Sequence, residues 1–272
     1  MTAEPRLCLA FQRRLLAWYR RHRRDLPWRR TRDPYKVLVS EIMLQQTQVE
    51  RVVPKYHEFL AKYPTLAALA RAPIGEVKRT WYPLGYNVRP VYLQGIAREA
   101  LARYDGRLPD EEKALRSLKG IGRYTAGALL SFAFGKAAPI LDTNVRRVLG
   151  RVFFGSRGLI RLKGQSALWK LAATLVPSGR AYDFNQALMD FGATWCTPRR
   201  PRCHPCPMKS FCKSYPMAET SLRRAVKTPS AGVAGDSPPT PSARVPAPGA
   251  GSPHRARRED GRSPSRRQDP RG

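Results

Sequence analysis

Apolar residues in the first 216 positions recur with helical spacing. Within 145–152, aliphatic side chains occupy positions i, i+3, i+4 and i+7, and basic residues fall on the opposite face: Arg146, Arg147 and Arg151. No stretch shows the sustained two-residue alternation, bounded by hairpin turns, that a β-sheet requires. The pattern therefore predicts an all-α fold.

Capping residues and prolines indicate where several helices begin. Asp33 and Pro34 are typical of a cap and a first helical residue, and the apolar run behind them predicts one buried helix from Val37 to Val49. Similar starts occur at 64–66 and 109–111. Further helices are expected at Thr125–Phe134, Trp169–Val176 and Phe184–Phe191.

The composition is strongly basic, with 50 Lys and Arg residues against 20 Asp and Glu, a net charge of +30. This excess favours polyanionic partners, nucleic acid first, although an arginine-rich composition with a solvated surface would give the same number. No apolar run reaches the length of a membrane span, and basic residues interrupt the apolar segment 7–11 too early for a signal peptide. We therefore expect a location in the reducing cytoplasm.

The segment Met217–Gly272 differs from the rest. It contains no aromatic residue, nine prolines, and eleven basic against five acidic residues. Such a segment cannot bury enough apolar surface to offset the entropy lost on ordering. It is predicted to be a disordered tail that attracts DNA weakly at most, so the strongly basic character belongs to residues 1–216.

Four cysteines with the spacing C-x6-C-x2-C-x5-C lie close together: Cys196, Cys203, Cys206 and Cys212. In a reducing compartment such a group is more typical of a metal centre than of disulfides. Four thiolates can hold zinc or a [4Fe–4S] cluster. Zinc ribbons usually pair two C-x2-C units and this chain has one, which favours the cluster. Cys8 lies apart and is expected to be a buried or idle thiol.

A Gly-x-Gly turn separates two expected helices. A short helix from about Asp110 ends at Gly120 and Gly122, and the next begins at once. The unpaired N–H groups of that next helix could bind a DNA phosphate without reading sequence, as in a helix-hairpin-helix. A simple helix C-cap is the alternative, but the cysteine group and the charge favour DNA binding.

Two acids stand out against their surroundings. Glu41 is the one carboxylate in 37–44, a run otherwise apolar apart from Ser40. It is either a structural cap or salt-bridge partner, or a carboxyl whose pKa burial raises so that it keeps a proton. Asp142, the second acid, precedes the helix near 145–152, where Asp142 or Asn144 could be nothing more than an N-cap.

Residues 6–215 resemble the helix-hairpin-helix DNA glycosylases of the endonuclease III and MutY branch, which carry a [4Fe–4S] cluster with this cysteine spacing. Stretches similar to MutY adenine glycosylases are 27–29, 39–49, 84–86, 184–188 and 196–198. The resemblance implies a six-helix barrel lobe over 29–135, with the helix-hairpin-helix near 110–134, and a cluster lobe from 1–28 and 136–216.

The resemblance also implies an activity. It points to a monomeric glycosylase of base excision repair that removes adenine opposite 8-oxoguanine or guanine in duplex DNA. Glu41 would protonate the departing base, and Asp142 would stabilise the oxocarbenium-like sugar. Tyr124 and Asn144 would orient the sugar and Asp142. Bifunctional relatives have lysine where Tyr124 stands, and a phenol cannot form their Schiff base, so no strand cleavage is expected.

Base flipping implies further roles. By the same resemblance, Gln46 would fill the vacated stack and Tyr86 would wedge beside the opposite base. The extruded base would lie against Gln186, Trp28 and Arg29. A surface glutamine, a core tyrosine and a packed tryptophan are the simpler alternatives for these positions.

The chain departs from the MutY pattern at several positions. It has Pro83 and Asn87 in a stretch that is usually Gly-Leu-Gly-Tyr-Tyr, Lys119 in place of proline, and Thr143 where many relatives have glycine. Full-length MutY proteins carry a C-terminal domain that senses 8-oxoguanine, and the segment 217–272 is expected to have no core to form one. The alternatives are a thymine or uracil glycosylase acting on T·G mismatches and a non-catalytic, metal-containing DNA-binding module.

Overall fold

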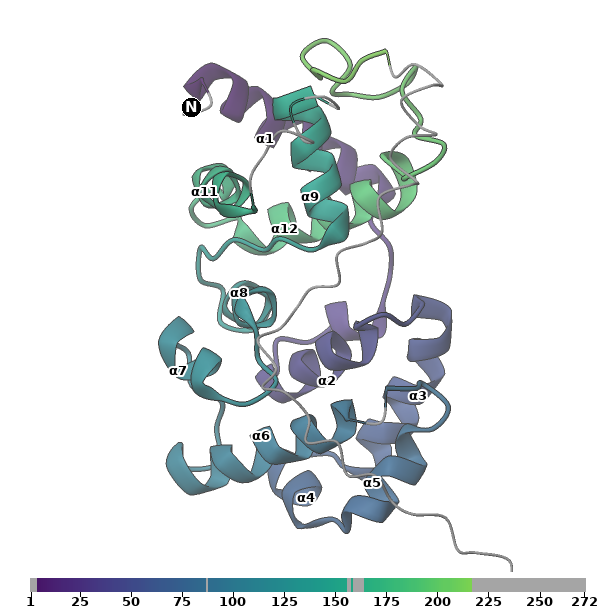
Figure 1. Ribbon diagram of the computed structural model, residues 1–272, viewed down its shortest axis with the longest axis vertical. Helices are drawn as coiled ribbons and strands as arrows, with labels where there is room; N and C mark the ends of the chain where they lie inside the picture. The colour runs from purple at the N-terminus through teal and green to yellow at the C-terminus, as the bar shows by residue number, and fades with distance from the viewer. Residues whose placement is uncertain (1–3, 87, 156–157, 159–163, 217–272) are drawn as a thin grey trace, which may run out of the picture. The chain divides into compact units, whose positions relative to one another are not determined.

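The computed structural model describes residues 4–86, 88–155, 158 and 164–216. Over these residues the regular elements are helices and no strand is present, which confirms the all-α prediction (Figure 1). None of the helices in this part of the chain is both long and apolar enough to cross a membrane. Residues 217–272, which include the whole predicted tail, lie outside the described ranges.

The elements in chain order include two π-helical turns (η2 and η3) and a 3-10 turn (η1). They are α1 (Pro5–His22), η1 (Pro27–Arg29), α2 (Pro34–Leu44), α3 (Val49–Lys62), α4 (Leu66–Arg71), α5 (Ile74–Trp81), α6 (Arg89–Arg103), α7 (Glu112–Ser117), α8 (Arg123–Phe132), α9 (Thr143–Leu149), η2 (Gly150–Phe154), α11 (Ser166–Leu175), α12 (Ala181–Asp190) and η3 (Phe191–Trp195).

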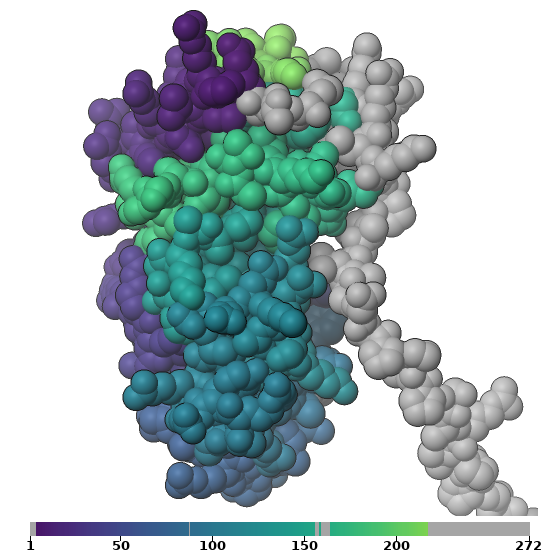
Figure 2. Space-filling view, turned by 90° about the vertical axis from the view of Figure 1, so that its left-hand side faces the viewer, coloured from purple at the N-terminus to yellow at the C-terminus, as the bar shows by residue number. Residues whose placement is uncertain are grey.

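The helices pack in two groups that meet at α8. In one group α2 contacts α3, α6 and α8, and α6 contacts α4 and α5. In the other, α12 contacts α1 and α9, and α11 contacts both of these. The N-terminal helix thus packs with C-terminal elements, and Figure 2 shows purple α1 beside the green C-terminal segments. The bounds of the two lobes expected from the sequence stay a prediction.

The expected single helix over 37–49 is wrong, because the chain turns after α2 and restarts as α3 at Val49. Gln46 in this turn has a φ of 55°, a left-handed conformation that interrupts a helix. The guanidinium of Arg89 donates to the carbonyl oxygens of Ile42 and Met43, which therefore have partners without a further helical turn. A residue more than forty positions away thus marks where α2 ends.

Local capping was predicted more accurately. The Asp33 side chain accepts from the first N–H groups of α2, and the Thr65 side chain accepts from Ala68 at the start of α4. Both helices begin as expected, because these caps satisfy donors that have no partner within the helix. The helix after 109–111 begins at Glu112, and α8 begins at Arg123, each within about two residues of the expected start.

Arg151, one of the basic residues expected on the face opposite the aliphatic side chains of 145–152, is buried, with 6% of its surface exposed. It belongs to η2, and its guanidinium donates to the carbonyl oxygens of Thr197 and Pro198 at 2.7 and 2.8 Å. These contacts attach the end of α9 and η2 to the segment that carries the cysteines.

Candidate active site

Glu41 lies in α2 with 5% of its surface exposed. The apolar residues around it in sequence make α2 a buried helix, so the carboxyl is removed from water together with them. This burial raises the pKa of Glu41 to about 7. The Asp142 charge raises this pKa further, while a hydrogen bond from Tyr124 and the charge of Arg29 oppose the rise. Glu41 is therefore largely protonated below neutral pH and about half protonated near pH 7.

Tyr124 is half-buried in the first turn of α8, directly after the Gly-x-Gly turn. Its hydroxyl interacts with Glu41 and lies 3.6 Å from the sulfur of Met189 in α12. Burial, and next the nearby charge of Glu41, raise the pKa of this phenol well above its ordinary value. Tyr124 is thus a neutral hydroxyl beside the buried acid.

Asp142 caps α9, as one of its two readings expected. One carboxylate oxygen accepts from the Val145 amide at 2.7 Å, and the other accepts from the Asn144 side-chain amide at 2.9 Å. Burial raises the pKa of Asp142, while these hydrogen bonds and the charge of Arg147 lower it. The capping role also aims the carboxyl at the same region as Glu41, since the two acids interact.

The four residues expected to be catalytic therefore come together. Glu41, Tyr124 and Asp142 interact electrostatically, and Asn144 is hydrogen-bonded to Asp142. They arrive from α2, α8 and the start of α9, three elements separated by long stretches of sequence. A carboxyl with a raised pKa next to a second, hydrogen-bonded carboxylate is the arrangement that divides acid and stabiliser roles.

Sequence reasoning missed the function of Arg147, which it placed on a basic face. This guanidinium donates at 2.7 Å to the side-chain oxygen of Asn144 and to the carbonyl of Gly192, and at 2.8 Å to the carbonyl of Cys196. A Cβ atom on Gly192 would lie 2.7 Å from that of Asn144, so the close approach needs a glycine. Arg147 thereby links the acid site to the cysteine segment.

Arg29 takes part in a buried ion pair. Its guanidinium donates to both carboxylate oxygens of Asp190 at 2.7 and 2.8 Å, and Arg24 binds the same carboxylate at 2.6 Å. Asp190 is fully buried, and its ion pair was not predicted from the sequence. The one sequence feature that could have indicated it is an acid at the end of the apolar segment 184–191. Arg29 still influences the acid site, because its charge lowers the pKa of Glu41.

Two other residues expected at the base pocket are buried. Trp28 has 6% of its surface exposed and packs edge-to-face on Tyr56, with ring centroids 5.5 Å apart. Gln186 is buried in α12. The contact of Trp28 matches the simpler expectation of a packed tryptophan. Contact of either residue with a flipped base stays a prediction.

Gln46 and Tyr86 are both exposed and both have a left-handed backbone, with φ of 55° and 47°. Tyr86 is 59% exposed, which excludes the alternative of a core tyrosine. Non-glycine residues in this conformation are strained and concentrate at binding sites. Asn87, one of the departures from the MutY pattern, lies outside the described residues.

The predicted hairpin turn is present between α7 and α8. Gly120 has a φ of 103°, and a Cβ atom there would lie 2.8 Å from that of Tyr92. The turn therefore requires glycine at this position. Gly122 precedes the first residue of α8 and faces open space, which leaves its side of the turn accessible to a ligand.

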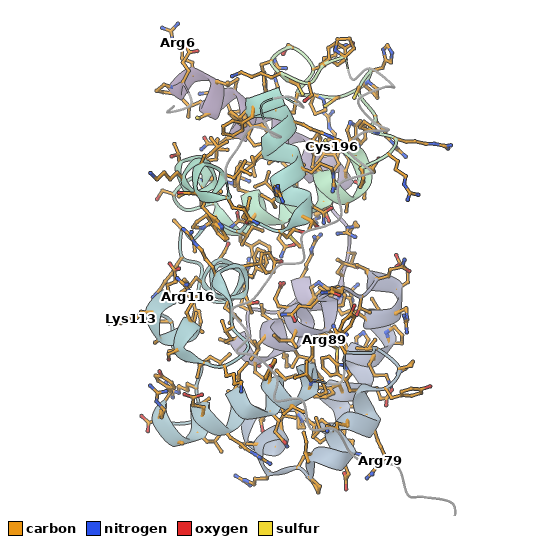
Figure 3. All side chains as sticks on the ribbon, viewed as in Figure 1. Arg6, Arg79, Arg89, Lys113, Arg116 and Cys196 are labelled. Carbon is orange, nitrogen blue, oxygen red and sulfur yellow. The ribbon has the colours of Figure 1, made fainter. Side chains whose placement is uncertain are left out.

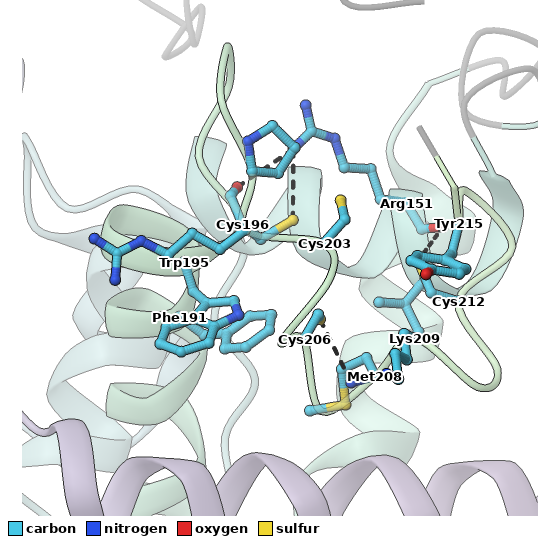
Figure 4. A pocket seen from close by; sticks show the side chains of 13 residues that line it. Arg151, Phe191, Trp195, Cys196, Cys203, Cys206, Met208, Lys209, Cys212 and Tyr215 are labelled. Carbon is cyan, nitrogen blue, oxygen red and sulfur yellow. Dashed lines mark hydrogen bonds between the residues drawn. The ribbon is translucent and has the colours of Figure 1, made fainter. Parts of the chain in front are cut away.

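The four grouped cysteines, Cys196, Cys203, Cys206 and Cys212, line one cavity (Figure 4). An Arg151 guanidinium nitrogen lies 3.5 Å from the Cys196 sulfur, and the Met208 amide donates to the Cys206 sulfur at 3.4 Å.

No disulfide joins any of the five cysteines, all of which lie in the described part of the chain, and Cys8 is buried as expected. Nowhere in the described ranges do three His, Cys, Asp or Glu side chains converge to hold a single metal ion.

Comparison with known proteins agrees with this geometry. Residues 39–172 match the HhH-GPD superfamily of base excision DNA repair proteins. A thymine/uracil-DNA glycosylase of Methanothermobacter thermautotrophicus is 40% identical over 76% of this chain and 93% of that protein. The chain belongs to the HhH-GPD superfamily. A thermostable thymine-DNA glycosylase structure superposes with a TM-score of 0.73 at 40% identity, covering 77% of this chain and 97% of that one.

The adenine DNA glycosylase of Homo sapiens is 46% identical over 77% of this chain. The matched part is 40% of the human protein, so the chain spans less than half the length of this relative. This chain therefore matches nearly all of the thymine/uracil glycosylase but less than half of the human adenine glycosylase.

Replacing Glu41 with Gln should stabilise the protein, and more so as the pH rises. The pKa of the Glu41 carboxyl is 4.5 in the unfolded chain and about 7 in the folded protein. Because the folded state holds the proton more tightly, wild-type stability falls as the pH rises from 4.5 to about 7. The loss amounts to about 3 kcal/mol. Glutamine keeps the shape of the neutral acid and does not titrate. Unfolding free energies should show a gain of about 3 kcal/mol at about pH 8 and under about 1 kcal/mol at about pH 5.

Glu50→Gln in the exposed part of α3 serves as the control, with a small effect at either pH. Equal effects of Glu41→Gln at the two pH values would mean that the buried carboxyl does not titrate in this window.

Proposed function

We propose that this protein is a monofunctional DNA glycosylase that works as a monomer in the cytoplasm and removes adenine paired with 8-oxoguanine or guanine. The observation that carries the proposal is the buried Glu41, which has a pKa of about 7 and interacts with a second acid, Asp142. The human adenine DNA glycosylase is 46% identical over 77% of this chain. The net charge of +30 suits a duplex DNA partner.

The two acids divide the chemistry. Glu41 keeps a proton at neutral pH and donates it to the purine, which leaves as a neutral base when the N-glycosidic bond breaks. Asp142 accepts two hydrogen bonds and lies near Arg147, and these contacts stabilise its charged form against the burial that raises its pKa. Its carboxylate stabilises the positive charge that develops on the sugar, and water then adds at C1′.

The same geometry supports hydrolysis without strand cleavage. Tyr124 stands at the hairpin position and its phenol forms no Schiff base. The neighbouring lysines are engaged elsewhere: Lys136 pairs with Asp110 at 2.7 Å, and the Lys119 amine lies 5.7 Å from the centre of the Tyr92 ring. The product is therefore an abasic site in an intact strand.

A second candidate function is the removal of thymine or uracil from mispairs with guanine. It is favoured because the chain matches almost the whole length of a thymine/uracil glycosylase. This chain covers 93% of the Methanothermobacter thymine/uracil glycosylase but 40% of the human adenine glycosylase. Thymine has no N7 to protonate, however, so it offers no comparable use for the proton on Glu41. A non-catalytic DNA-binding module would have no use for a buried acid pair at all.

The cysteine site fits a [4Fe–4S] cluster better than a single zinc ion. Cys196, Cys203, Cys206 and Cys212 line one cavity, and a [4Fe–4S] cube takes one thiolate on each of its four irons, whereas zinc ribbons usually pair two C-x2-C units and this chain has one. The amide of Met208 and the guanidinium of Arg151 supply the hydrogen bonds that stabilise thiolate sulfur.

A bound cluster would be held by the four cysteines, would cross-link the segment 196–212 and would have a structural role. Four basic side chains on that segment are exposed and can then meet DNA phosphates: Arg199, Arg200, Arg202 and Lys209.

Glu41→Gln and Asp142→Asn should each lose base excision by about 10²–10⁴-fold while retaining fold and mismatch binding. Asparagine still caps α9, and glutamine is isosteric with the neutral acid. Because both acids act on one transition state, the double variant should lose less than the product of the two single effects. Single-turnover base release would be measured on duplexes with A opposite 8-oxoguanine or G, and with T opposite G.

Near-normal adenine release by Glu41→Gln would end the adenine proposal. Retained thymine release by that variant, with Asp142→Asn inactive, would put the thymine function first.

The purified protein should contain about four irons per chain and absorb near 400 nm, roughly as expected for a thiolate-bound cluster. Cys203→Ser should lower iron content, soluble yield and DNA binding together, because the cluster holds the basic segment. Cys8→Ala, outside the site, should keep the iron. Stoichiometric zinc without iron after anaerobic purification would contradict the cluster.

A further inference from the structure

Arg89 is a buried cation at an unfavourable place. It has 4% of its surface exposed and is the first residue of α6, where the helix dipole disfavours positive charge. Burial lowers the pKa of its guanidinium. Within the described residues, none of the hydrogen-bond or ion-pair partners of Arg89 is a carboxylate. Its Nε has no hydrogen-bond partner among these residues. Burying the Arg89 charge here is unfavourable, which suggests that the residue has a specific role.

The guanidinium of Arg89 instead binds six neutral oxygens from two separate regions. Two carbonyls come from the last turn of α2, a carbonyl and a hydroxyl come from the loop that follows it, and two further carbonyls come from the loop after α5. The distances are 3.0 Å to Ile42, 2.9 Å to Met43, 2.6 Å to Gln45, 3.1 Å to Thr47, 2.9 Å to Leu84 and 3.2 Å to Gly85. One planar group thus joins both loops.

These are the loops that carry Gln46 and Tyr86. Each of these two residues is exposed and has a left-handed backbone next to a carbonyl that Arg89 binds. The guanidinium carbon also lies 5.4 Å from the centre of the Tyr86 ring. Figure 3 labels Arg89 in the same region as α2, from which the first loop emerges. The two side chains expected to enter DNA are therefore held through one residue.

We propose that Arg89 is a positioning residue that sets the two loops at the separation needed for Gln46 and Tyr86 to enter DNA at the same base step. The inference rests on the proposed function for its DNA step. A rigid guanidinium fork can serve two rows of carbonyls at once, whereas the compact ammonium of lysine can reach only some of them. Other contacts hold one loop alone: Trp81 donates to Gly85, and Arg51 donates to Pro83.

The first test needs no DNA. In Arg89→Lys, hydrogen exchange should speed up together at the Thr47 and Leu84 amides, which belong to the two loops and bond to Leu44 and Trp81. Amides inside α8 should keep their exchange rates, which separates loop release from general destabilisation. Arg98→Lys is the matched control, because Arg98 lies in the same helix and also donates to a carbonyl, at 3.0 Å.

The second test follows the DNA. 2-Aminopurine beside the mispaired base reports unstacking whichever base is extruded, on duplexes with A or T opposite G. Arg89→Lys should reduce unstacking and the single-turnover excision rate in the same proportion, by roughly 10–100-fold. Glu41→Gln should retain unstacking and lose excision, which distinguishes positioning from chemistry. Arg98→Lys should behave as the unsubstituted protein.

Unchanged exchange at either loop, or unchanged unstacking with Arg89→Lys, would overturn the inference. If the unsubstituted protein unstacked neither mispair, the proposed function would fail, while the exchange experiment would still decide whether Arg89 joins the loops.

Discussion

Burial of one carboxyl group in an apolar helix is the constraint on which the site depends. Glu41 cannot shed its proton at neutral pH without placing a charge where water is excluded, which raises its pKa to about 7. The same burial costs the folded state stability above that pH. A chain that needed α2 only for packing would gain by replacing this acid, so its presence is best explained by chemistry that uses the proton.

The second acid shows how local structure changes the outcome of the same burial. Asp142 is also withdrawn from water, yet it caps α9 and accepts from Asn144, and Arg147 lies close by. Hydrogen bonds and the charge of Arg147 oppose the rise that burial causes in the pKa of Asp142, whereas the hydrogen bond from Tyr124 and the charge of Arg29 leave the pKa of Glu41 at about 7. In the proposed function, these two like groups act as an acid and a charge stabiliser.

Much of the site was predictable because its signals are local. A lone acid in an apolar run, a cysteine spacing and a Gly-x-Gly turn can be read without tertiary structure, and Glu41 and Gly120 lie as expected. The long-range polar contacts could not be read this way. Arg89, Arg147 and Arg151 look like members of a basic surface in sequence, and their buried carbonyl partners appear only when distant segments meet.

The end of α2 shows the same limit. The helix predicted from the sequence ran on through the polar residues 45–48 to Val49, whereas Arg89, which lies in another helix, marks where α2 ends. Propensity within the segment therefore predicted too long a helix, because a tertiary contact decided the boundary.

The pH dependence of adenine release tests the central claim most directly. With Glu41 acting in its protonated form, the single-turnover rate should fall about tenfold per pH unit above the pKa of about 7. The residual rate of Glu41→Gln should lack this decline, since glutamine does not titrate. A wild-type rate that stays level or rises between about pH 7 and pH 9 would contradict the account of Glu41 as the buried proton donor.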